Sequence, residues 1–328
     1  MALLSNDGDL DKPEVVDMLK ETKPNEAEPH TLFQSLDVDE SGGISCKGFL
    51  EVLLPTKNET VDVPTEFNCN FLDPALAESA DFIAELERYC LSHSAVEHHF
   101  LQNLAVASFG KATTLDLITK FFAAYSHFNL GFIPNLRNLI DLLEKQEHKD
   151  VLKENLEEEM GHYDEETLVE LENMGISRKS VVGIPHPILF SEMLDCMEWK
   201  VNRSYRAFVP ANIVSIKNNV IKELTAEGKN GLLAVIYFGS ELIVPILYGK
   251  LLQGLRNSCD ELSNEELRFL ILHIDMDDGH AVKLREIVMD SCNTMEERVA
   301  LRNNTGKILN ARLKFYDAIC EIISAGEW

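Results

Sequence analysis

The chain lacks features that define several large classes of protein. Its seven cysteines are scattered and form no CxxC pair, which argues against a disulfide framework and indicates reduced thiols. Basic residues are scarce: 30 Lys and Arg stand against 55 Asp and Glu, and the formal net charge is −25. We therefore expect no unassisted binding to nucleic acid or to an anionic membrane. The amino terminus shows no basic or apolar segment typical of a secretory signal, so we predict a cytoplasmic protein.

Long uninterrupted apolar segments are also absent. The most apolar stretch, residues 231–252, contains Gly239, Glu241 and Pro245, whereas a membrane-spanning helix needs about 20 mostly apolar residues in a row. We therefore predict that this stretch forms a buried core helix and that the protein has no membrane partner. Alternation of Val, Ile and Thr with polar residues is scarce as well, which argues against a β-sheet architecture.

Hydrophobic residues instead recur at intervals of three and four through residues 74–328, the pattern of amphipathic helices. With 45% hydrophobic residues, the chain can bury a core large enough to hold a site between helices. The predicted fold class is therefore all-α, a helical bundle, with breaks at residues 131–134, 183–187 and 257–260. The expected helices are 75–94, 95–109, 112–129, 132–145, 149–162, 165–174, 187–202, 207–227, 230–256, 262–290 and 294–325.

The N-terminal part differs from this bundle in composition. Residues 1–28 are polar, acidic and aperiodic, and we predict a flexible terminus. Residues 29–73 are predicted to form a small helical extension and a linker. The twelfth position of an EF-hand-like loop in this extension should be a bidentate Glu but is Gly48. We therefore favour a solvated helix-turn-helix and keep a calcium-responsive adaptor as an alternative. The residues that match the EF-hand loop are Asp37, Asp39, Ser41, Gly42 and Ile44.

Residues 267–288 carry the most suggestive pattern of possible metal ligands. His273, Asp277 and His280 follow one another at spacings of four and three. On one continuous α-helix these side chains fall within about 60° of each other. Two imidazoles and a carboxylate on one stripe suit iron better than a soft metal. An ordinary solvated helix face is the alternative.

Two further segments supply candidate ligands. Glu159 and His162 are three residues apart in an acid-rich stretch, the Glu-x-x-His spacing of di-iron carboxylate bundles; a solvated acidic face is the alternative. Glu241 lies in apolar sequence, where an uncompensated carboxylate costs several kcal/mol. A metal ion would offset that cost, and the alternatives are protonation, an ion pair or rotation to the surface.

In chain order, the segments ENLEEEMGH, YFGSELIVPILY and LHIDMDDGHAVKL resemble the ligand segments of the haem-oxygenase-like di-iron oxidase and oxygenase family, which is related in fold to PqqC and TENA-type proteins. The resemblance covers about residues 75–325 and implies a haem-oxygenase-like bundle with a non-haem di-iron centre. In many relatives the first histidine follows the glutamate at a longer interval, so His186 is the alternative to the preferred His162. The implied ligands are Glu159, His162, Glu241, His273, Asp277 and His280.

The same resemblance implies an O2-dependent oxidoreductase that holds two Fe2+ ions per chain and uses O2 as co-substrate. The implied reaction is N-oxygenation, desaturation or oxidative C–C cleavage of a small amino-acid-like or amine-bearing substrate. Oxidative decarboxylation of a fatty acid on the same centre is one alternative, and a metal-free enzyme of PqqC/TENA type is another. The resemblance is compatible with a homodimer and with an external electron donor.

Overall fold

The computed structural model describes residues 10–11, 43–44, 79–275, 277–325 and 328. From residue 79 onward the described chain is helical and contains no strand, which confirms the predicted all-α fold. The α-helices are α4 (Ser79–Leu91), α5 (His99–Ala105), α6 (Lys111–Leu142), α7 (Gln146–Glu159), α8 (Glu165–Asn173), α9 (His186–Lys200), α10 (Ala211–Ala226), α11 (Lys229–Leu233), α12 (Val244–Ser258), α13 (Arg268–Asp275), α14 (Asp277–Asp290) and α15 (Met295–Ala325). Two 3-10 helices, η1 (Arg178–Ser180) and η2 (Arg206–Phe208), and one π-helix, η3 (Ala234–Glu241), complete the set.

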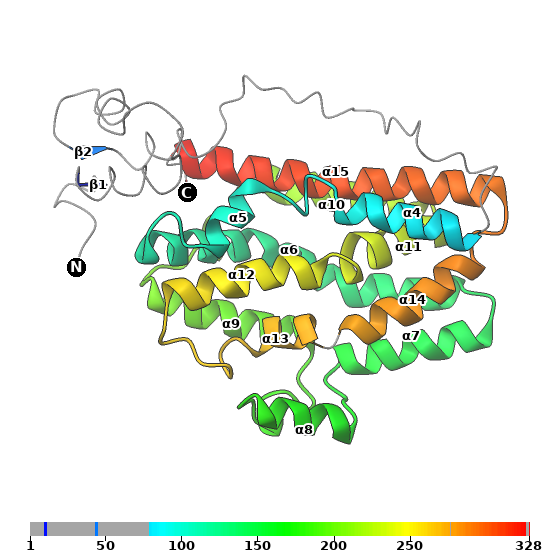
Figure 1. The fold of residues 1–328 in the computed structure, drawn as a ribbon, viewed down its shortest axis with the longest axis horizontal. Helices are drawn as coiled ribbons and strands as arrows, with labels where there is room; N and C mark the ends of the chain where they lie inside the picture. Colours follow the sequence, from blue (N-terminus) through cyan, green and yellow to red (C-terminus); the bar gives the residue numbers. More distant parts are fainter. Residues whose placement is uncertain (1–9, 12–42, 45–78, 276, 326–327) are drawn as a thin grey trace.

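The helices pack around α6, which runs through the middle of the bundle (Figure 1). Helices α7, α9 and α12 pack against α6, and the long α15 lies along α10, α11 and η3. Aromatic rings fill the centre: Phe121 and Phe122 of α6 contact Phe315 of α15 and Phe190 of α9, respectively. All four rings are buried. Burial of each such side chain stabilises the fold by roughly 1.5–3 kcal/mol, so the aromatic centre is a main source of stability.

Helix α6 is continuous where the sequence predicts a break. It passes through Pro134 without interruption, so the break expected at residues 131–134 is wrong. A proline inside a helix removes one backbone hydrogen bond and costs about 3 kcal/mol. The packing of α6 against α7, α9 and α12 helps to offset that cost.

The apolar stretch predicted as one helix over 230–256 is divided into α11, η3 and α12. The amide of Leu242 donates to the carbonyl of Tyr237, five residues back, at 3.0 Å, which is the wider hydrogen-bond pattern of a π-helix. In the part of the chain that the structure describes, Lys229–Ser258 is the one helical stretch long and apolar enough to cross a membrane. Of its most apolar window, 78% is buried inside the fold, as expected of the predicted core helix.

Helix α7 ends at Glu159 rather than at the predicted residue 162. The chain leaves the helix through Gly161, whose φ of 87° is in the left-handed region. Backbone bonds from Gly161 to the carbonyl of Glu158 and from His162 to that of Glu157 complete a Schellman motif. Residues 159 and 162 therefore do not lie on one helical face.

The stretch predicted as one helix over 262–290 is described in two parts. Helix α13 ends at Asp275 and α14 begins at Asp277, with residue 276 outside the described residues. The common stripe expected for His273, Asp277 and His280 crosses that residue and stays a prediction.

The N-terminal predictions lie mostly outside the described residues. A short antiparallel pairing joins β1 (Leu10–Asp11) to β2 (Gly43–Ile44), with Leu10 opposite Ile44. Gly43 and Ile44 belong to the stretch that resembles an EF-hand loop. Its presumed ligands and Gly48 lie outside the described residues, so calcium binding stays a prediction.

Gly161 offers a test of how the loop before α9 is held. A Cβ on Gly161 would lie 2.5 Å from the backbone nitrogen of Ile184, whereas a Cβ on Gly175, which ends α8 with a φ of 82°, would have no neighbour within 4 Å. We expect Gly175→Ala to lower the free energy of unfolding by about 1–2 kcal/mol through backbone strain alone. Gly161→Ala should cost clearly more because it also displaces Ile184. Chemical denaturation measures both, and equal losses would contradict this close packing.

Candidate metal centre

Acidic and imidazole side chains from five helical segments meet near the ends of those segments. Glu159 is the last residue of α7, His186 the first of α9 and Glu241 the last of η3, while His273 and His280 come from α13 and α14. The exposed fractions of Glu159, His186, Glu241 and His280 are only 4–7%. Burial of so many ionisable groups is costly unless they interact with one another or with a ligand.

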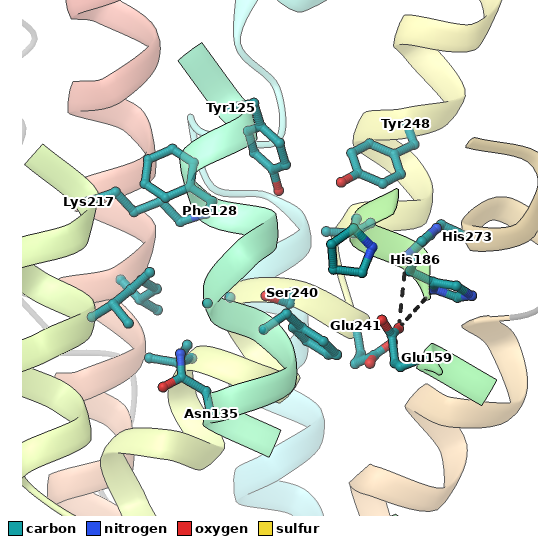
Figure 2. A pocket seen from close by; sticks show the side chains of 18 of the residues that line it. Tyr125, Phe128, Asn135, Glu159, His186, Lys217, Ser240, Glu241, Tyr248 and His273 are labelled. Atoms are coloured by element: carbon teal, nitrogen blue, oxygen red, sulfur yellow. Dashed lines mark ion pairs between the residues drawn. The ribbon is translucent and has the colours of Figure 1, made fainter. Parts of the chain in front are cut away.

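Glu159, His186 and His273 form the tightest group. Nδ1 of His186 lies 3.2 Å, and Nε2 of His273 lies 3.9 Å, from Oε1 of Glu159, as the dashed lines in Figure 2 mark. One ligand atom from each residue lies within 4.8 Å of the other two. Nδ1 of His186 makes no hydrogen bond despite its burial. The three atoms therefore surround one small volume with the two-histidine, one-carboxylate set that suits non-haem iron.

Contacts on the far side of each ring fix which nitrogen faces Glu159. Nδ1 of His273 lies 2.8 Å from the carbonyl oxygen of Phe269. Because a carbonyl only accepts, Nδ1 carries the proton and Nε2 can present its lone pair to a metal. Nε2 of His186 lies 2.8 Å from the hydroxyl of Tyr163, which can accept the proton of that nitrogen and leave Nδ1 as the ligand atom.

A second carboxylate–imidazole pair lies beside this group. Nε2 of His280 is 2.7 Å from Oε2 of Glu158, and it is the donor because an ionised carboxylate only accepts. Nδ1 of His280 lies 4.0 Å from Oε2 of Glu241. Asn155 donates from Nδ2 to Oε1 of Glu241 at 3.4 Å. The ring of His280 is thus held by one carboxylate and turned toward another, an arrangement typical of metal-ligating histidines.

The electrostatic environment keeps Glu159 ionised. Burial alone would raise the pKa of this carboxyl, but His186, His273 and His280 in their protonated forms, with a hydrogen bond from His186, outweigh burial and lower the pKa to about 2. A cation held between the neutral rings would act on the carboxyl in the same direction. Burial and then the negative charge of Glu159 raise the pKa of Tyr163 well above its ordinary value. The group therefore combines an ionised carboxylate with a neutral phenol, both of which suit a bound cation.

The cluster borders one end of a pocket. Glu159, Glu241, His186 and His273 line that end, and Tyr248 continues the wall (Figure 2). Among the residues that the structure describes, no lysine or arginine pairs with Glu159, whose ion-pair partners are histidines. A carboxylate oxygen and two imidazole nitrogens around one point, with no basic side chain between them, fit a metal ion of the iron type.

The structure places one predicted ligand, His162, away from the cluster. The side chain of His162 is 61% exposed and its Nδ1 pairs with Glu157, not with Glu159. His186, the alternative raised from the sequence, lies beside Glu159 instead. The reason is the end of α7: the turn at Gly161 directs His162 to the surface.

The other predicted ligands are placed as follows. Glu159, Glu241, His273 and His280 all belong to the buried cluster. The side chain of Asp277 lies outside the described residues, so its role stays a prediction.

A second set of acids with a histidine, Glu147, His148 and Asp290, lies at the surface. Lys145 forms an ion pair with Asp290, and His148 lies 3.1 Å from the same carboxylate. Because the protein itself supplies the positive charge, this set is a solvated ionic network and not a second candidate centre.

Sequence reasoning did not single out Glu158 or Lys217. Glu158 is one of three consecutive glutamates, and only its contact with His280 distinguishes it from a solvated acid. Lys217 had a detectable signal: it lies four residues after Ile213 and seven before Leu224 on the apolar stripe of α10, where all three side chains are buried. A charged side chain at a buried position of an apolar stripe indicates either an ion pair or a ligand-binding site.

Comparisons with known proteins agree with this geometry. A family model described as "Iron-containing redox enzyme" matches residues 119–312, more than half of the chain. A solved CADD-like protein of unknown function from Nostoc punctiforme superposes with a TM-score of 0.57 at 15% identity, covering 74% of this chain and 97% of that one. A TenA homologue from Pseudomonas syringae gives 0.54 at 11% identity, covering 76% and 96%. At these identities the two structures show a shared fold. No curated protein sequence matches the chain.

The exchange of His162 for His186 can be tested by metal binding alone. We expect His186→Ala to weaken the binding of Fe2+ by at least about tenfold, because it removes a nitrogen that faces Glu159. His162→Ala is the matched control and should bind Fe2+ like the wild type, since this ring is exposed. Anaerobic titration followed by metal analysis measures both. Normal affinity in the first variant and a loss in the second would restore the original ligand set.

Proposed function

Because the chain belongs to the haem-oxygenase-like family of iron-containing redox enzymes, we propose that its buried cluster holds two iron ions and uses O2 to oxidise a small organic substrate. One observation carries this proposal. Two carboxylate–imidazole sets, each with its rings oriented by acceptors on the far side, lie next to each other beside one pocket. A single structural ion pair would need only one of them.

The first iron would be held by Glu159, His186 and His273, whose ligand atoms lie closest together. The second would be held by Glu241 and His280, with Asp277 as the further ligand that the sequence predicts. The carboxylates suit this role because they bind one or two metal ions through their two oxygens. The π-helix supports it as well, since such wide turns occur frequently at functional sites and η3 ends on Glu241.

Bound iron would supply the electrons that activate O2. The protein would contribute by positioning the ligand side chains and by excluding water. The acceptors Phe269 and Glu158 keep the imidazoles of His273 and His280 in the tautomers that bind metal. Burial of the cluster limits the access of water to the reacting atoms, and the adjoining pocket would hold the substrate.

The reaction we favour is N-oxygenation, desaturation or oxidative C–C cleavage of a small amine-bearing or amino-acid-like molecule. Oxidative decarboxylation of a fatty acid is the second candidate, because aliphatic side chains form part of the pocket wall. A metal-free reaction is less favoured, because it would leave an ionised glutamate and two oriented imidazoles without a metal ion to bind. Repeated turnover would require an external electron donor to return the iron to its reduced state.

The stoichiometry of iron tests the two-metal proposal. We expect anaerobically loaded wild type to bind about two Fe2+ per chain, and Glu241→Gln to bind about one, because the variant loses a carboxylate of one set only. Glu157→Gln changes an exposed acid of the same helix as Glu159 and should retain both ions. Metal analysis after desalting gives the values. A wild type with a single tight ion would contradict the two-metal centre.

The reaction with O2 tests the activity separately. Mixing the Fe2+-loaded enzyme with O2 in a stopped-flow instrument should give a transient visible absorption, since oxidised iron pairs absorb where Fe2+ does not. The transient should decay faster when a true substrate is present. Candidate amino acids, simple amines and fatty acids are compared in this assay. An enzyme that holds two irons yet shows no change of absorption with O2 would contradict the oxygenase proposal.

A further inference from the structure

The pocket contains a buried basic residue at the end away from the metal cluster. Lys217 of α10 is only 4% exposed and lines the same pocket as Glu159 and His273. Figure 2 shows Lys217 and Phe128 on the opposite side of the pocket from these two residues. Nζ of Lys217 lies 4.2 Å from the ring centroid of Phe128. The amine of Lys217 therefore lies in the pocket at the end away from the metal cluster.

Lys217 has no anionic partner within the described part of the chain: its recorded contacts are with the rings of Phe128 and Tyr125, the latter 5.1 Å from Nζ. Arg312, the charged group that acts on it, is also basic and only 1% exposed. Burial first, and then the charge of Arg312, lower the pKa of Lys217 well below its ordinary value. Keeping this amine protonated without a carboxylate beside it is therefore costly. An anion brought by a ligand would offset that cost.

Arg312 prepares a second donor at the same end. Its Nη1 donates to the hydroxyl oxygens of Tyr125 at 3.3 Å and Tyr316 at 3.1 Å, and its Nη2 donates to the carbonyl of Gly239. Because the Tyr125 oxygen accepts from Arg312, its own proton remains available to donate. Figure 2 shows the Tyr125 hydroxyl directed toward the pocket interior. One amine and one hydroxyl can thus reach the same ligand group.

The rest of the pocket wall is mixed. Together with the polar Asn135 and Ser240, four aliphatic side chains from α10, η3, α12 and α15 line it: Ile221, Val235, Val244 and Ile308. A ligand that spans the pocket therefore suits this wall best with an anionic end, a partly apolar middle and an oxidisable end.

We propose that Lys217 and Tyr125 bind the carboxylate of the substrate and so select carboxylic acids whose far end reaches the cluster. This inference rests on the proposed function only for the oxidation at the far end; anion binding itself does not require iron. A carboxylate is favoured over a phosphate because a single amine and a hydroxyl match a monoanion, whereas a dianion usually recruits more donors. The assignment applies to an amino-acid-like substrate and to a fatty acid alike.

Calorimetric titration of the metal-free full-length chain tests this proposal without any turnover. The probes are 4-phenylbutyrate and its uncharged analogue 4-phenylbutyramide. We expect the wild type to bind the carboxylate at least about tenfold more tightly than the amide, since a buried charge-assisted bond is formed only with the acid. Lys217→Met should abolish the preference and retain amide binding. Lys222→Met changes an exposed lysine of the same helix and should behave as the wild type.

Several outcomes would overturn the assignment. One is a wild type with no preference for the acid, and another is a Lys217→Met variant that keeps the preference. Tyr125→Phe should reduce the preference without removing it, and an unchanged preference would remove Tyr125 from the anion site. Tighter binding of 3-phenylpropylphosphonate than of the carboxylate would reassign the site to phosphate-like ligands. Thermal unfolding confirms that each variant is folded.

A repeat with Fe2+-loaded protein under anaerobic conditions separates this proposal from the preceding one. Carboxylate binding that appears only with iron and is the same in Lys217→Met would place the acid at the metal and overturn the proposal. Conversely, a preference for the acid in a protein that binds no iron would support the anion site while contradicting the di-iron function.

Discussion

The constraint on which the structure depends is the burial of two glutamates inside a helical core. Glu159 and Glu241 are each about 95% buried, and a buried carboxylate needs a compensating partner because the apolar core provides none. Imidazoles from three other helices approach these carboxylates, with 3.2 to 4.0 Å between the paired nitrogen and oxygen atoms. The contacts that compensate the buried carboxylates thus also bring together the side chains of which we propose the metal centre is built.

The cluster is built where regular helices stop. Glu159 is the end of α7, His186 the start of α9 and Glu241 the end of the π-helix, while His273 and His280 lie on either side of the α13–α14 junction. A side chain at a helix end can be aimed by the adjacent turn, whereas one in mid-helix is fixed by the helical period. The Schellman turn at Gly161, which packs against Ile184 just before His186, shows how two such ends are brought together.

This construction explains how far sequence reasoning could go. Periodicity predicted the all-α fold because apolar spacing reflects the regular interior of helices. It identified Glu241 because a charge in apolar sequence is conspicuous. It preferred His162 over His186 because it extended a helix by three residues beyond its true end, although Gly161 in EEEMGH carries the signal of a helix C-terminus. Pro134 led to the opposite error. It predicted a break at residues 131–134, whereas packing against several neighbouring helices keeps α6 continuous. The partnership of Glu158 with His280 joins residues 122 positions apart and needs the three-dimensional structure.

The π-helix has a consequence for how this chain can vary among relatives. A π-helix bonds each amide five residues back, whereas an α-helix bonds it four back, so the loss of one residue from Ala234–Glu241 would favour α-helical spacing and change where Glu241 lies relative to the residues before it. Substitutions that preserve size are therefore easier to accommodate in η3 than insertions or deletions. The length of this segment, more than the identity of its apolar residues, is what homologous chains with the same centre would have to share.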